Sequence, residues 1–112
     1  MTAPTSTYAE MAEELTYDSS GGDATFQSMG TLTENPIMMI FDNQSDVAIA
    51  ITNDITKTWR TFPAGEALVL DLRANHGLPS EFSFKKTTEL FASSAVGTGN
   101  FSISYIYGRL FP

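Results

Sequence analysis

Residues 58–72 are the stretch around which we expect the rest of the chain to be organised. They read TWRTFPAGEALVLDL, with apolar segments at residues 59–62 and 67–72 on either side of a Pro-Ala-Gly-Glu sequence. Proline fixes φ and glycine tolerates positive φ, so this tetrapeptide is typical of a tight corner. In the second segment, leucines at every other position leave one face aliphatic and the other mixed. The pattern predicts a strand, a corner and a strand at the rim of a sandwich core.

Other short apolar segments follow one another at intervals of about ten residues, separated by turn residues. Residues 37–41 (IMMIF) form an apolar run short enough for a buried strand, and residues 47–52 (VAIAIT) alternate in size. We expect these two segments to form a hairpin through the polar residues 42–45. In residues 101–107 (FSISYIY), the positions of Phe101, Ile103 and Tyr105 share one face and should lie in the core. Further strands are predicted at residues 25–33, 81–84 and 88–91.

These segments amount to about eight strands, which is the number of a jelly roll. The sequence therefore predicts an all-β fold, a jelly-roll-like sandwich that occupies residues 25–112. The order in which the strands pair is left open by the pattern.

The N-terminal residues 1–24 have a different pattern. Thr7 and Glu10 have the spacing of a capping box, and Tyr8, Met11 and Leu15 recur at helical intervals. We expect a short amphipathic helix over residues 8–15, followed by a flexible joint at residues 18–23. The segment is predicted to be an arm that is dispensable for folding and presents one apolar stripe to a partner.

Composition excludes several classes of protein. The 112-residue chain is of single-domain length and contains no cysteine, which rules out a disulfide framework and thiolate metal sites. No apolar run approaches the roughly 18 residues of a membrane span, and the N-terminus lacks the basic and apolar regions of a signal peptide. We expect a protein made in the cytoplasm that has no membrane partner.

Charge is distributed unevenly along the chain. The net charge is −7, which opposes binding to nucleic acid. Residues 1–56 contain nine acids and no Lys or Arg, and every basic residue lies at Lys57 or beyond. This arrangement is either a solvated acidic surface or a surface complementary to a basic partner. A second copy of the chain could be that partner, in a homo-oligomer such as a dimer, unless strands from the two halves interleave and mix the charges.

Candidate chemistry is sparse. His76 is the only histidine and lies in a Gly/Pro-containing segment without the signature of an oriented base. Asp42 and Asp46 flank DNQSD, which lacks the glycine and terminal glutamate of a calcium loop and is more simply a turn. We predict no enzymatic activity, no metal site and no cofactor.

Two groups of residues are candidates for binding a partner. Trp59 and Arg60 are either partly buried core residues or a pair that stacks on a sugar or a protein surface. Tyr8, Met11 and Leu15 form the predicted stripe of the arm.

Three stretches together resemble small structural proteins of tailed-phage virions. They are DNQSDVAIAIT, WRTFPAGEALVLDLRAN and the closing FSISYIYG, and the resemblance covers about residues 37–108. Length, arm and strand number are also similar to the capsid decoration proteins, called cement or staple proteins, of short-tailed phages.

The resemblance implies a jelly-roll-like sandwich on the outer capsid surface of a virion, bound to the major capsid protein and bridging neighbouring capsomers. It implies no catalytic residues. Two hypotheses follow. The chain is a capsid decoration protein, or it is a tail- or fibre-associated module that binds host carbohydrate or another virion protein, with Trp59 and the tyrosines lining a sugar site.

Overall fold

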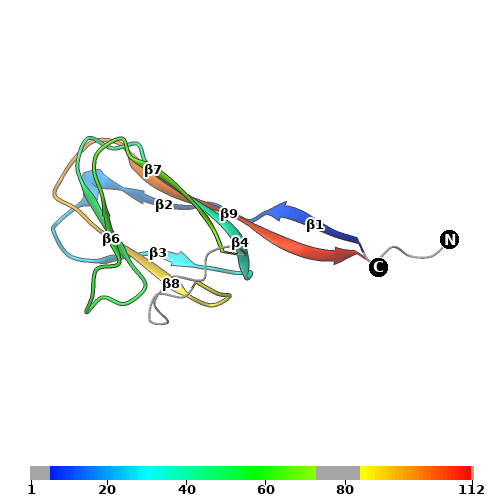
Figure 1. The fold of residues 1–112 in the computed structure, drawn as a ribbon. Coiled ribbons are helices and arrows are strands. Elements are labelled where there is room, and N and C mark those ends of the chain that lie inside the picture. The colour runs from blue at the N-terminus through cyan, green and yellow to red at the C-terminus, as the bar shows by residue number, and fades with distance from the viewer. Residues whose placement is uncertain (1–5, 73–83, 112) are drawn as a thin grey trace.

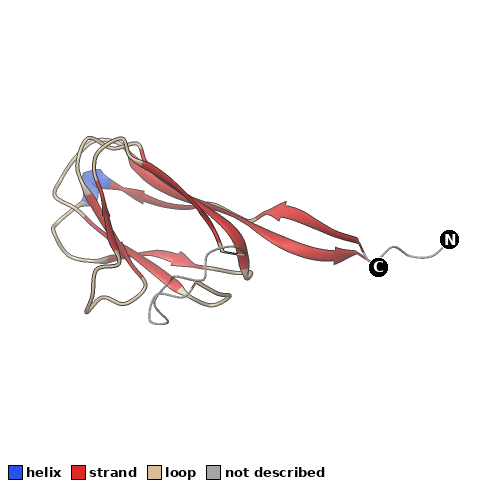
Figure 2. Ribbon diagram, viewed as in Figure 1, coloured by secondary structure: helices blue, strands red, loops and turns tan. Residues whose placement is uncertain are grey.

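The computed structural model describes residues 6–72 and 84–111, which form two antiparallel β-sheets packed against each other (Figure 1, Figure 2). One short 3₁₀ helix, η1, lies between the second and third strands. The elements are β1 (Ser6–Met11), β2 (Leu15–Asp18), η1 (Ser19–Gly21), β3 (Gln27–Thr31), β4 (Pro36–Asn43), β5 (Ile49–Thr52), β6 (Arg60–Phe62), β7 (Ala67–Asp71), β8 (Glu89–Ser93) and β9 (Asn100–Phe111).

The strand order of the two sheets is that of a jelly roll. Sheet A has the order β2-β9-β4-β7, with β1 pairing farther along the same edge of β9, and sheet B has the order β3-β8-β5-β6. Leaving β1 aside, the eight strands divide equally between two sheets, and strands from both ends of the chain alternate in each. The predicted all-β sandwich is therefore confirmed, and its strand order is like that of a jelly roll.

Interleaving of the strands bears on the charge pattern. β9 lies between β2 and β4 in sheet A, and β8 lies between β3 and β5 in sheet B. The two halves of the chain therefore do not form two separate surfaces, which removes the simple argument for self-association through opposite halves. Self-association itself stays a prediction.

The core lies between the two sheets, where alternate residues of each strand point inward. In β9, Phe101, Ile103 and Tyr105 are almost fully buried, as the alternation predicted. Leu70 of β7 is buried, and Leu68 of β7 and Leu72, which follows the strand, pack against the core, so the predicted aliphatic face is also confirmed. The largest fully buried side chains include Phe41, Phe62, Leu90 and Met39.

The predicted hairpin of residues 37–52 is wrong. β4 and β5 form as strands, but β4 lies in sheet A and β5 in sheet B. The polar residues between them are partly inside the protein: Asn43 and Ser45 are buried and hydrogen-bonded to each other. A buried polar turn of this kind carries the chain from one sheet to the other, and sequence alone does not distinguish it from an exposed hairpin turn.

The predicted helix over residues 8–15 is also wrong. Residues 6–11 and 15–18 form β1 and β2, which both pair with β9. A helix this short is marginal in water, whereas pairing with a long strand satisfies the backbone groups. Tyr17 of β2 is 5% exposed, and its hydroxyl is hydrogen-bonded to Ser94 at 2.9 Å. Residues 15–22 thus pack within the sandwich.

β1 and the end of β9 form a two-stranded ribbon that projects from the sandwich (Figure 1). β4 pairs with β9 as far as Tyr107, whereas β1 pairs with it from Ile106 to Phe111. The β4–β9 ladder is irregular where it ends at Pro36, which has no N–H to donate. Within the described residues, β9 beyond Tyr107 therefore has β1 as its single partner strand.

The remaining predictions are partly covered by the structure. β3 and β8 confirm strands near residues 25–33 and 88–91. Of the predicted strand 81–84, only Phe84 is described, and it is buried. His76 lies outside the described residues. No helix in the described part of the chain is long and apolar enough to cross a membrane.

Candidate binding face

The outer face of sheet A combines exposed apolar side chains with a polar groove. On β9, Ser102, Ser104 and Ile106 alternate with the buried core residues and therefore face outward. The strand register sets their neighbours on β4, which are Asp42, Ile40 and Met38 respectively. This regular alternation places a defined set of side chains side by side on one surface.

Five outward-facing apolar residues of β1, β4, β7 and β9 form what we call the apolar band. Met38 lies between Ile106 of β9 and Asp71 of β7 in the register, and Ile106 is also paired with Met11 of β1. Ile40 is paired with Val69. Val69 is 60% exposed and Met11 is 59% exposed. The apolar band consists of Met11, Met38, Ile40, Val69 and Ile106.

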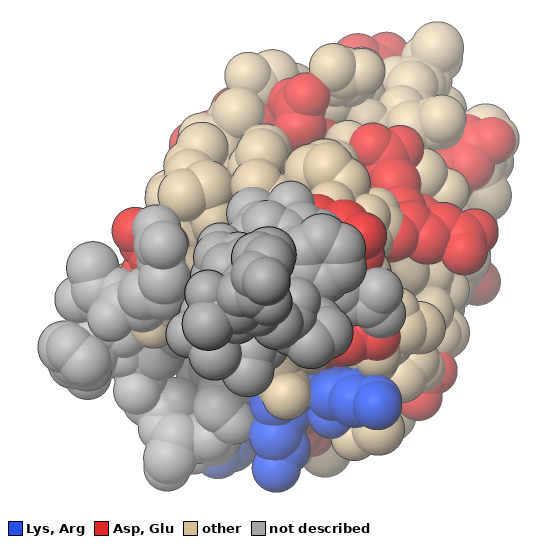
Figure 3. Space-filling model, turned by 90° about the vertical axis from the view of Figure 1, so that its right-hand side faces the viewer, with Lys and Arg blue, Asp and Glu red and all other residues tan. Residues whose placement is uncertain are grey.

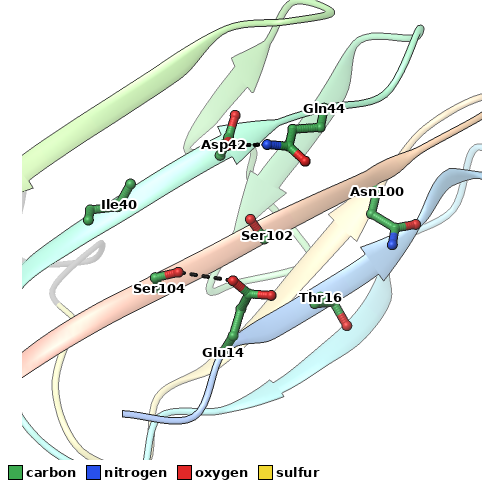
Figure 4. A pocket seen from close by; sticks show the side chains of 8 residues that line it. All are labelled: Glu14, Thr16, Ile40, Asp42, Gln44, Asn100, Ser102 and Ser104. Atoms are coloured by element: carbon green, nitrogen blue, oxygen red, sulfur yellow. Dashed lines mark hydrogen bonds between the residues drawn. The ribbon is translucent and has the colours of Figure 1, made fainter. Parts of the chain in front are cut away.

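The polar groove adjoins the apolar band at Ile40 and runs across β2, β9 and β4 (Figure 4). It has a volume of about 260 Å³. Its lining residues are Glu14, Thr16, Ile40, Asp42, Gln44, Asn100, Ser102 and Ser104.

Hydrogen bonds fix the two carboxylates of the groove. Ser104 donates its hydroxyl to Glu14 at 3.1 Å, and the Gln44 amide donates to Asp42 at 2.8 Å (Figure 4). Within the described residues, neither carboxylate has a Lys or Arg at ion-pair distance. The groove therefore offers two carboxylates, hydroxyls and amides, which together suit a ligand with cationic N–H donors.

The charges around this face are acidic. Asp18, at the end of β2, also faces outward, and hydrogen bonds from the backbone and side chain of Ser20 lower its pKa. The described basic side chains lie elsewhere, in β6 or in the loops leading to β6 and β8: Lys57, Arg60, Lys85 and Lys86. Figure 3 views the molecule from the ribbon end, where the visible Lys and Arg side chains gather at the bottom and the acids are spread over the rest.

Trp59 is part of an aromatic cluster. Its ring lies 5.1 Å from the rings of Phe41 and Phe84 and 6.2 Å from that of Phe62, measured between centroids. It is half-buried and packs against the core. Of the two interpretations left open by the sequence, the partly buried core residue is the one that the structure supports.

Arg60 is exposed and has partners within the chain. Its guanidinium forms an ion pair with Glu66 at 2.7 Å and lies 5.1 Å from the centroid of the Phe62 ring. These contacts span the corner between β6 and β7. Trp59 and Arg60 are thus engaged locally and do not form a shared platform.

The predicted stripe of the arm does not exist as one face. Leu15 packs against the core, whereas Met11 is exposed on the outer face of sheet A. Tyr8 lies in β1, opposite Arg109 in the register. Of the five candidate residues, Met11 alone is seen to contribute to the candidate binding face.

Asp42 and Asp46 have separate surroundings. Asp42 lies in the groove, and Asp46 accepts a hydrogen bond from the backbone N–H of Thr98 at 2.8 Å. Among the residues that the structure describes, no group of three or more His, Cys, Asp or Glu side chains could hold a metal ion.

Comparison with family models, with curated proteins and with solved structures gave no match to this chain. The candidate binding face therefore rests on its own geometry. Sequence analysis missed the groove because its residues come from β2, β4, β9 and the residues next to these strands, which are distant in sequence. The one available signal was the alternation of small polar residues, Ser102 and Ser104, on the outer face of the closing strand.

Proposed function

We propose that the protein is a phage capsid decoration protein that binds the outer surface of the head shell. It would bridge neighbouring copies of the major capsid protein and have no catalytic role. The proposal is supported by the resemblance over about residues 37–108 together with the jelly-roll strand order. Jelly rolls occur in many functional classes, so the fold alone does not carry the proposal.

The structural observation that most supports the decoration role is the projecting β1–β9 ribbon. Four residues of β9 lie beyond Tyr107, the last residue of β9 that pairs with β4, and four residues of strand span roughly 13 Å. An isolated two-stranded ribbon is marginally stable in water. A ribbon that extends beyond the sandwich core is best explained by contact with a partner.

A sandwich with a projecting ribbon can contact two shell subunits at once, one through the sandwich and one through the ribbon. A protein that binds the assembled shell but not the dissociated subunits stabilises the shell by mass action. Two modest contacts on one molecule also reinforce each other through their high effective concentration. Repetition over a symmetric shell then gives a large total stabilisation from individually weak interfaces.

The carbohydrate-binding alternative receives no support from the described aromatic side chains. Tyr17 and Tyr105 are buried, and Trp59 packs against phenylalanines. Tyr107 donates a hydrogen bond to Glu10. A site in which aromatic side chains stack on a sugar needs an exposed aromatic platform, and the polar groove has no aromatic lining.

Particles assembled without the protein provide the test. Purified protein is added to such heads, and the bound copies and the temperature of DNA release are measured. We expect saturable binding at a fixed ratio to the shell subunit and a higher release temperature. Binding to isolated tails but not to heads, or binding without any change in release temperature, would contradict a decoration role.

A further inference from the structure

We propose that the outer face of sheet A docks onto a protein surface that presents Lys or Arg beside apolar side chains. The basic side chain would enter the polar groove, and the apolar side chains would cover the apolar band. This inference rests on the proposed function and deepens it, because it names the face of the sandwich that meets the shell and the chemistry of the surface it meets.

Exposure of the apolar band is the first argument. An antiparallel sheet with one solvated face normally alternates apolar residues inside with polar residues outside. Sheet A departs from this rule at five contiguous outward positions, among which Val69 and Met11 are more than half exposed. Contiguous exposed apolar surface of this kind marks interaction sites, whereas single exposed residues are ordinary.

Sheet B provides an internal comparison. Its outward positions include the exposed Ser28, Thr61 and Glu89. Among the described strands of sheet B, the large apolar side chain at an outward position is that of Phe91, which is half-buried. The other strongly exposed apolar residues, Ile55 and Val96, lie singly in loops. A contiguous group of five large apolar side chains therefore occurs on the outer face of sheet A, whereas the described strands of sheet B carry one such side chain.

The charges on the outer face of sheet A indicate which kind of partner surface binds there. Glu14, Asp18 and Asp42 lie on the outer side of sheet A, whereas Lys57, Arg60, Lys85 and Lys86 lie outside that sheet. Arg109 of β9 lies in the ribbon, opposite Tyr8 of β1 and beyond the last residue of β9 that pairs with β4. If two copies met through this face about a two-fold axis, each acidic face would oppose another acidic face, which is unfavourable. A partner surface bearing Lys or Arg supplies the missing charge.

The groove fits this assignment in size and chemistry. Its volume of about 260 Å³ accommodates the end of a long side chain. Glu14 is contributed from the β2 side and Asp42 from β4, with Ser102 and Ser104 of β9 between them (Figure 4). A guanidinium or ammonium group placed there would meet carboxylate and hydroxyl acceptors on both sides.

Two pairs of matched variants test the inference in the binding assay with heads that lack the protein. Val69→Asp places a charge in the apolar band, and Val96→Asp makes the same change at a loop valine that is 69% exposed. Glu14→Lys reverses a charge in the groove. Glu89→Lys makes the same reversal on sheet B, at a glutamate that likewise accepts a serine hydroxyl. Thermal unfolding of each variant checks that it is folded.

We expect Val69→Asp and Glu14→Lys to weaken binding by roughly tenfold or more, as for residues central to an interface. Val96→Asp and Glu89→Lys should bind within about twofold of the unchanged protein, as rim or non-contact positions do. If all four folded variants bind like the unchanged protein, the docking face is wrong while the decoration role stands.

A photo-crosslinking residue at position 69, and separately at position 96, keeps the inference testable if the unchanged protein does not bind heads. Crosslinks formed in particle-producing cells are mapped by mass spectrometry. A position-69 crosslink to a Lys- or Arg-containing segment of a protein other than the shell subunit would support the face and overturn the decoration role. A crosslink to a second copy of this chain, or equal crosslinking from positions 69 and 96, would overturn the docking inference.

Discussion

A hydrogen bond between Asn43 and Phe62 joins the two sheets at one rim of the sandwich. Asn43 ends β4 in sheet A, Phe62 ends β6 in sheet B, and the Asn43 amide donates to the Phe62 carbonyl oxygen at 3.0 Å. The same amide donates to the carbonyls of Val47 and Pro63, and its Oδ1 accepts from Ser45. One fully buried side chain therefore holds both the chain crossing after β4 and the corner after β6.

Replacing this side chain should destabilise the protein strongly. Asn43→Ala removes a donor to the buried Phe62 carbonyl and the acceptor of the buried Ser45 backbone N–H. Each buried group left unsatisfied costs about 1–3 kcal/mol. We expect the free energy of unfolding, measured by urea denaturation, to fall by about 2–3 kcal/mol. Gln44→Ala is the control, because Gln44 is exposed and its side-chain amide donates to the Asp42 carboxylate at the surface. Equal, small effects for both variants would contradict the role given to Asn43.

Two isoleucines of β9 test which side of the strand points into the core. Ile103 is fully buried, and Ile106 lies on the outer face. Ile103→Ala should lower the free energy of unfolding by about 2–5 kcal/mol, because it leaves a cavity in the core. Ile106→Ala should cost clearly less. The reverse order of the two effects would show that the strand is facing the other way.

Two N-terminal deletions separate the ribbon from the sandwich. Removing residues 1–11 takes away β1 alone, and we expect a cooperative thermal transition to remain. Removing residues 1–22 also takes away Leu15 and the buried Tyr17, so the transition should weaken sharply or disappear. This differs from the sequence prediction of a wholly dispensable arm. An unchanged transition after the longer deletion would mean that β2 does not support the core.

Stability should decline at acid pH. Hydrogen bonds from the side chain and backbone of Thr25 lower the pKa of Asp23, and bonds from the backbone and side chain of Thr56 lower that of Asp54. Because folding lowers these pKa values below 3.8, the stabilisation is present above that pH and is lost as the pH falls through the folded values. The difference in melting temperature between the unchanged protein and Asp54→Ala should therefore shrink below about pH 4. A difference that stays constant from pH 7 to pH 2 would contradict this assignment.

Strand positions were predictable where inward and outward residues alternate cleanly. Phe101, Ile103 and Tyr105 are separated by residues that face outward, and the leucines of β7 follow the same rule. Such alternation is a local property of the sequence, so it identifies both the strand and its buried face. The corner after β6 was predictable for a similar reason: Gly65 adopts a φ of +79°, which suits glycine.

Pairing between distant strands was not predictable. Tyr8, Met11 and Leu15 fit a helical period, and nothing nearby in the sequence reveals that β9 supplies a strand partner for their backbone. The groove depends on the same long-range register, which aligns Thr16, Ser102 and Asp42 in one row. Sequence analysis consequently found Met11 but missed the face to which it belongs.

The copy number of the protein in purified intact particles tests the central claim most directly. Particles are separated from free protein and from isolated tails, and the ratio of this chain to the major capsid protein is measured by quantitative mass spectrometry. A decoration role predicts a fixed ratio on DNA-filled heads, retained through repeated purification and set by the number of equivalent sites on the shell. Absence from intact heads, or a few copies found with the tails, would contradict it.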